Sequence, residues 1–293
     1  MGLIMSAPWS KLKVFRRVAK RRDSDGHRML STPATVSRML GVSGKEPTQM
    51  DLERITHPLR LASGSHQPGS AKGCAMNVIS YINGDEQITD FPATSARPLA
   101  AFVQLCNDQL AGSDGYLTTD DAIVALDLGW LTVGTADVAG IVIRPWVSKL
   151  LISPPWGVAR YADGAAAEAI SDIAELHRRL APGEMPDITT WDRAGRAARE
   201  ISAAAAVGAE KYAVRAACQS TLLADTEDWD MLDAVTGNAL RAHRLANLDG
   251  GQDRIVEMTR QAIRSWRRLA GLSVVGNAPG SVTKAVQRKG AAA

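Results

Sequence analysis

Hydrophobic residues recur at helical spacing along most of this chain. In the segment 96–110 the apolar positions are Leu99, Phe102, Val103, Cys106 and Leu110. Steps of three and four residues place these side chains on one face of an α-helix. The same periodicity predicts helices over residues 74–84, 158–181, 190–223, 227–247 and 252–270. In the last of these, Ile255, Met258, Ala262, Trp266 and Leu269 form the inward-facing stripe.

Residues that favour helix ends bound several of these segments. Gly84 suits the left-handed position that follows a helix. Thr118 or Thr119, with two aspartates behind it, is typical of a helix start, and Asp137 is expected to cap the next helix. That helix contains Pro145, which predicts a kink, and ends before the Pro-Pro pair at 154–155.

The pattern predicts an all-α protein, a multi-helix array with short irregular loops and few or no strands. Breakers and shifts in composition suggest four parts. These are a basic amphipathic arm (1–30), an N-terminal helical domain (31–156), an alanine-rich helical domain (157–271) and a disordered basic tail (272–293). Alanine-rich segments favour helix because alanine loses no side-chain entropy on folding.

Composition narrows the class of protein. Hydrophobic residues make up 45% of the 293 residues, charged residues 22%, and the net charge is +3. The most apolar stretch, 122–152, contains Asp127, Asp137, Arg144 and Lys149, which argues against a transmembrane segment and for a cytoplasmic protein. Three widely spaced cysteines fit neither a disulfide framework nor a CxxC zinc site.

Positive charge gathers at the two ends. The predicted arm has Trp9, Leu12 and Phe15 on one face, and the last helix presents a row of arginines opposite its apolar stripe. The candidate binding residues are Lys13, Arg16, Arg17, Lys20, Arg21, Arg22, Arg260, Arg264, Arg267 and Arg268. Such cations can neutralise phosphates or an acidic partner, although they can equally be solvated helix faces. His177 and His243, each beside arginines, are expected to be solvated as well.

Cys74 is the main candidate for chemistry. It starts a predicted helix after a glycine-containing loop, where the helix dipole lowers a thiol pKa. His66 and Asp90 lie near it in sequence and would complete a nucleophile, base and orienting acid. The alternative is a small buried cysteine at a helix start. His57, His66, Cys74 and Asp90 have zinc-ligand chemistry, but their spacing matches no known signature, so no metal or cofactor is predicted.

The block 59–150 contains several short distinctive segments. They are Leu61-Ala62-Ser63-Gly64-Ser65-His66, Gly73-Cys74-Ala75-Met76, Gly84-Asp85-Glu86, Asp90-Phe91-Pro92-Ala93, Arg97-Pro98-Leu99, Asn107-Asp108 and Val133-Gly134-Thr135-Ala136-Asp137. With these segments the block resembles a family of uncharacterised proteins from actinobacteria and their phages. The resemblance implies an all-helical fold and an actinobacterial or phage origin. It implies no activity.

These features favour a non-enzymatic helical binding or regulatory protein, encoded by a phage or prophage. It would act on a host protein or on nucleic acid through its basic ends, and self-association stays open. One alternative is a cysteine-dependent hydrolase or transferase that uses Cys74 and His66. The other is a structural or assembly protein of a phage particle.

Overall fold

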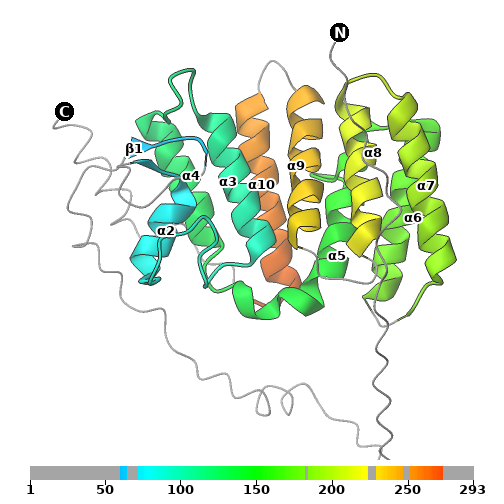
Figure 1. Cartoon of the computed structure of the whole chain (residues 1–293), viewed down its shortest axis with the longest axis horizontal. Coiled ribbons are helices and arrows are strands. Elements are labelled where there is room, and N and C mark those ends of the chain that lie inside the picture. The colour runs from blue at the N-terminus through cyan, green and yellow to red at the C-terminus, as the bar shows by residue number, and fades with distance from the viewer. Residues whose placement is uncertain (1–59, 65–71, 182–183, 224–228, 247–250, 273–293) are drawn as a thin grey trace, which may run out of the picture. The chain divides into compact units, whose positions relative to one another are not determined.

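The predicted all-α class is confirmed by the computed structural model, which describes residues 60–64, 72–181, 184–223, 229–246 and 251–272 (Figure 1). All described residues belong to one compact unit of the chain. The predicted arm (1–30) and nearly all of the predicted tail (272–293) lie outside the described residues.

Helices account for most of the described chain. The α-helices are α2 (Ala75–Asn83), α3 (Arg97–Leu110), α4 (Thr119–Leu131), α5 (Ala139–Ile152), α6 (Gly164–Leu180), α7 (Ile188–Ala204), α8 (Ala209–Ser220), α9 (Trp229–Ala246) and α10 (Gly251–Leu269). Short 3₁₀ helices are η2 (Ala136–Val138), η3 (Val158–Tyr161) and η4 (Thr221–Leu223). The strands are β1 (Arg60–Leu61) and β2 (Lys72–Gly73).

Two of the predicted helix ends are confirmed and one is wrong. Gly84 follows α2 in the left-handed conformation, with φ 79°. The Thr118 hydroxyl accepts a hydrogen bond from the backbone N–H of Asp121 at 3.2 Å and so caps α4. Asp137 caps no α-helix, because it lies within η2, and α5 begins two residues later with Val138 at its N-cap.

The helix predicted over 190–223 is two helices. α7 ends at Ala204 and α8 begins at Ala209, with Gly208 at its N-cap. The connection reads Ala-Ala-Val-Gly, and Gly208 is a local signal against a continuous helix that the prediction overlooked. The reversal lets the two helices pack against each other.

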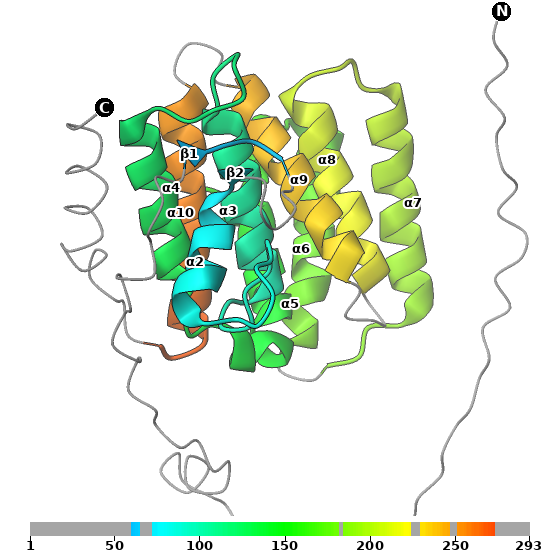
Figure 2. The ribbon, with the colours of Figure 1, turned by 60° about the vertical axis from the view of Figure 1, so that its left-hand side comes forward.

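The strands form a small parallel pair beside α2 (Figure 2). Arg60 pairs with Lys72, and Leu61 with Gly73. Their hydrogen bonding continues at Ala62, whose N–H donates to the carbonyl of Gly73 at 3.0 Å. This pair fixes where the chain enters α2, and so it positions Cys74.

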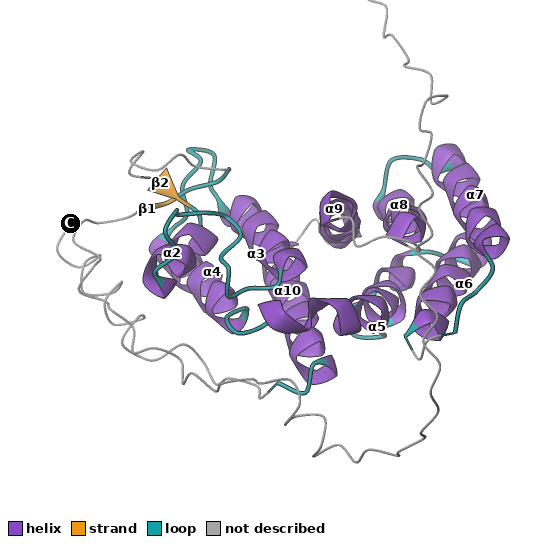
Figure 3. Ribbon diagram, turned by 60° about the horizontal axis from the view of Figure 1, so that its bottom comes forward, coloured by secondary structure: helices purple, strands orange, loops and turns teal. Residues whose placement is uncertain are grey.

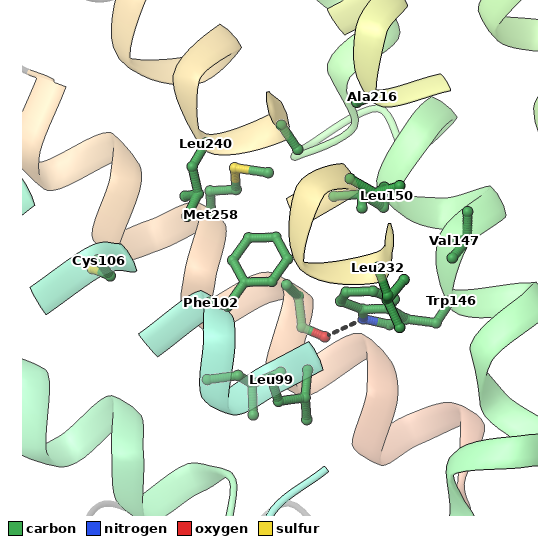
Figure 4. Packing of buried hydrophobic residues seen from close by; sticks show 14 of the residues in the cluster. Leu99, Phe102, Cys106, Trp146, Val147, Leu150, Ala216, Leu232, Leu240 and Met258 are labelled. Atoms are coloured by element: carbon green, nitrogen blue, oxygen red, sulfur yellow. Dashed lines mark hydrogen bonds between the residues drawn. The ribbon is translucent and has the colours of Figure 1, made fainter. Parts of the chain in front are cut away.

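One buried cluster contains residues from both predicted helical domains. The two C-terminal helices turn back against the N-terminal ones: α9 packs on α3, and α10 contacts α3, α4 and α5 (Figure 3). At the centre, the ring of Trp146 meets Phe102 and Trp266 edge to face, with centroids 5.7 and 5.4 Å apart. Figure 4 shows the Trp146 indole N–H donating to the carbonyl of Ala262, at 2.9 Å. The predicted boundary at 156/157 falls within this cluster, since it includes both Trp156 and Val158.

Candidate functional site

Cys74 occupies the N-cap of α2, directly after β2, and its side chain is completely buried. Its backbone is extended, with φ −84° and ψ 171°, as is usual for an N-cap residue. The Cys74 N–H donates to Asn77 Oδ1 at 2.9 Å. The Asn77 side chain, in the first turn of α2, thus holds the backbone of the N-cap residue Cys74.

Asp90 lies against this helix start, as the sequence interpretation expected. Its Oδ1 accepts hydrogen bonds from Asn77 Nδ2 at 2.8 Å and from the Cys74 thiol at 3.3 Å. Its Oδ2 accepts from Gln104 Nε2 on α3, at 3.1 Å. The carboxylate therefore joins the start of α2 to α3 through three donors. His66, the proposed base, lies outside the described residues.

The expectation that the Cys74 thiol has a lowered pKa is wrong. Burial and the neighbouring Asp90 carboxylate raise the pKa of Cys74 to about 12. The backbone N–H groups of Met76 and Asn77 act in the opposite direction, as the helix dipole argument predicted, but more weakly than burial. At neutral pH this cysteine is a thiol that donates to Asp90, and a thiol is a poor nucleophile.

Asn107 and Asp108 complete the polar arrangement around α2, and the sequence reasoning gave them no role. Asn107 is fully buried on α3; its Oδ1 accepts from the Ala75 N–H at 3.2 Å, and its Nδ2 donates to the Ala62 carbonyl at 2.9 Å. Asp108 Oδ1 accepts from the Gly64 N–H at 2.8 Å. These two residues fasten the β1 segment and the start of α2 to α3. The sequence signal that could have identified these two residues is an adjacent Asn-Asp pair within an otherwise apolar predicted helix.

The arginines of α10 do not form one exposed row. Arg267 was expected to face outward, but only 4% of it is exposed, and its Nη1 donates to the carbonyls of Leu131 and Val133. Arg260 pairs with Glu257 on the same helix, at 2.9 Å. Arg264 is half-buried and Arg268 is exposed. The arm cations from Lys13 to Arg22 lie outside the described residues.

The two histidines expected in solvent are also buried. The His177 ring meets Trp191 edge to face, and its Nε2 lies 3.0 Å from Ser220 Oγ. The His243 ring lies between the Tyr161 hydroxyl, 2.7 Å from Nδ1, and the Trp156 carbonyl, 2.9 Å from Nε2. Burial lowers the pKa of His177 to about 3 and that of His243 to about 4, so both rings are neutral at pH 7.

Among the described residues, the hydrogen bonds around Cys74 hold the start of α2 and the β1 segment against α3. Within the described segments, no three His, Cys, Asp or Glu side chains are grouped so that they could hold a metal ion. No described helix combines the length and the apolar run that a membrane crossing needs.

Comparison of the chain with protein-family models, with curated proteins and with solved structures finds no match in any of the three. The resemblance to the actinobacterial and phage family therefore stays a prediction.

Proposed function

We propose that this chain is a non-enzymatic helical binding protein that recognises nucleic acid through basic residues at its ends. A phage or prophage origin belongs to the same proposal and rests on the sequence resemblance alone. A regulatory role is part of the proposal as well, and the resemblance implies nothing about it. The state of Cys74 supports the non-enzymatic part, because a buried thiol hydrogen-bonded to a carboxylate lacks the reactivity that a cysteine hydrolase needs.

The observation that carries the proposal is the end of α10. Arg264 and Arg268 are four residues apart on the helix and therefore share a face. Within the described residues, neither arginine has a carboxylate within ion-pair distance, unlike Arg260. The sequence continues from here to Lys284, Arg288 and Lys289. Unpaired arginines can replace the counterions that surround nucleic-acid phosphates.

The test is DNA binding across a range of salt concentrations. Anisotropy of a fluorescein-labelled DNA duplex would be measured between about 50 and 200 mM salt, a range over which phosphate contacts weaken strongly. If Arg264 and Arg268 each contact a phosphate, the variant R264Q/R268Q should lower the slope of log K against log salt by about 1.8. Deleting residues 1–30 should abolish binding.

The matched control is R178Q, which removes an exposed cation that is already paired with Glu175. The slope of log K against log salt for R178Q should equal that of the wild type. This control separates the loss of a phosphate contact from a general effect of lower net charge. Absence of DNA binding at low salt, or an unchanged slope in R264Q/R268Q, would overturn the proposal. A host protein that survives nuclease and high salt in a pull-down would replace nucleic acid as the partner.

A further inference from the structure

An open pocket of about 310 Å³, called the α7–α8 cavity below, is lined by residues of α7 and α8 and by none of the Cys74 cluster or of α10. Arg199 and Ser202 line it from the C-terminal half of α7. The lining residues from α8 are Lys211, Arg215, Cys218 and Gln219. The volume is at the lower end of the range for small-molecule sites, roughly 300–1,000 Å³.

Three of the seven residues that line this cavity are cations. Arg199, Lys211 and Arg215 are cations, and the lining includes neither aspartate nor glutamate. Among the described residues none of these three side chains forms an ion pair. Burial raises the pKa of the Cys218 thiol, whereas the positive charges of Arg199 and Arg215 lower it, so both cations act on the sulfur that lines the cavity.

The other polar groups of the cavity add hydrogen-bond donors. The Lys211 ammonium donates one hydrogen bond to the Ala205 carbonyl at 2.9 Å, so two of its three N–H groups remain. The Gln219 side-chain oxygen accepts from Asn238 Nδ2, and its own NH₂ group has no partner among the described residues. The site thus offers several donors and concentrated positive charge, the combination that binds an oxyanion.

We propose that this cavity is a binding site for the phosphate group of a small phosphorylated molecule. Two guanidiniums suit a phosphate because each can donate two parallel hydrogen bonds to its oxygens. Three cations without a carboxylate favour a dianion over a singly charged carboxylate ligand. The modest volume favours a small molecule over a polymer, whose backbone requires an extended groove.

Cys218 provides a direct readout, because it lines the cavity while Cys74 and Cys106 are completely buried. The experiment follows the rate at which iodoacetamide alkylates Cys218 in the full-length protein, by peptide mass spectrometry. The probes are inorganic phosphate and phenyl phosphate, compared with sodium chloride at equal ionic strength. At a ligand concentration roughly nine times Kd, about one site in ten is empty, so labelling should slow about tenfold.

Matched variants locate the effect. R199Q/R215Q should lose the protection of Cys218 by phosphate. R196Q removes an exposed arginine one turn away on α7 that does not line the cavity, so its protection should equal that of the wild type. R264Q/R268Q should also keep full protection, which separates this site from the proposed nucleic-acid contacts on α10.

Three results of the labelling experiment would each overturn the proposal: equal protection by chloride, wild-type protection in R199Q/R215Q, or loss of protection in R196Q. Circular dichroism would show whether each variant is folded. Equilibrium dialysis of the wild-type protein with radiolabelled inorganic phosphate provides a measurement that depends on no variant. One saturable site per chain supports the proposal, and absence of saturable binding at millimolar phosphate overturns it.

Discussion

Arg267 on α10 donates a hydrogen bond from Nη1 to the backbone carbonyl of Val133, 3.0 Å away. The same nitrogen lies 3.2 Å from the carbonyl oxygen of Leu131, the last residue of α4. The final carbonyls of a helix have no partner within the helix, so this guanidinium acts as a C-terminal cap supplied by a distant segment. It joins the end of α4 to α10 across more than 130 positions of sequence.

Replacing Arg267 with glutamine should destabilise the fold. The shorter side chain cannot reach both carbonyls, and a buried acceptor left without a donor costs about 1–3 kcal/mol. We expect the free energy of unfolding, measured by urea denaturation, to fall by about that amount. The control R268Q changes the exposed neighbour and should stay within about 0.5 kcal/mol of the wild type. Equal effects of the two substitutions would contradict the capping role.

Cys74 should resist alkylation in the folded protein. Its pKa of about 12 leaves almost no thiolate at pH 8, and its side chain is not exposed. In a time course with iodoacetamide followed by peptide mass spectrometry, Cys218 should label first and Cys74 only after urea is added. Selective, rapid labelling of Cys74 at neutral pH would instead restore the cysteine-dependent hydrolase or transferase as the leading function.

The sequence predicts the helix ends at Gly84 and Thr118 correctly, but it does not predict the role of Arg267. Thr118 and Gly84 were assigned correctly because capping depends on neighbouring residues and local backbone conformation. Arg267 was placed in solvent because a cation beside other arginines resembles a surface face. Its partners exist only where α4 ends in the folded molecule.

The site at Cys74 divides in the same way. The position of the cysteine at a helix start and its proximity to Asp90 were predicted. The thiol pKa was not, because desolvation depends on how α2, α3 and β2 pack around the sulfur, and it outweighs the local effect of the helix terminus. The cationic lining of the α7–α8 cavity was missed because the two helices were predicted as one.

Acid should destabilise this protein through its two buried histidines. Burial lowers the pKa of His177 to about 3 and of His243 to about 4, below the ordinary value of 6.5, so the unfolded chain binds protons first as the pH falls. The stabilising contribution is complete above pH 6.5 and is lost progressively down to about pH 4 for His243 and pH 3 for His177. Each histidine should contribute a slope of up to about 1.4 kcal/mol per pH unit.

The measurement is urea denaturation at several pH values between 5 and 7, where most carboxylates remain ionised. H177Q and H243Q should each remove about half of the decline in stability with acid. Both glutamines retain a hydrogen-bonding side chain that takes up no proton in this range. If neither variant changes the slope, the buried, neutral state assigned to these histidines is incorrect.

Two helical glycines should respond oppositely to replacement by alanine. Within a helix this substitution is favourable by up to about 1 kcal/mol, because glycine loses more backbone entropy on folding. At Gly195 in α7, however, an added Cβ would lie 2.7 Å from Thr221 Oγ1. That hydroxyl is held in place by donating to the Cys218 carbonyl at 2.7 Å. The clash requires η4 to shift, so G195A should be less stable by about 1–3 kcal/mol.

Gly237 in α9 is the matched control, since its nearest neighbour would be Leu105 Cδ1 at 3.7 Å, an ordinary van der Waals contact. G237A should therefore be more stable than the wild type, and the two variants can be compared by urea denaturation at one pH. If G195A and G237A were both more stable than the wild type, position 195 of α7 and Thr221 of η4 would be further apart than the structure places them. Since the α7–α8 cavity lies beside that contact, G195A should also weaken the protection of Cys218 by phosphate, whereas G237A should leave it unchanged.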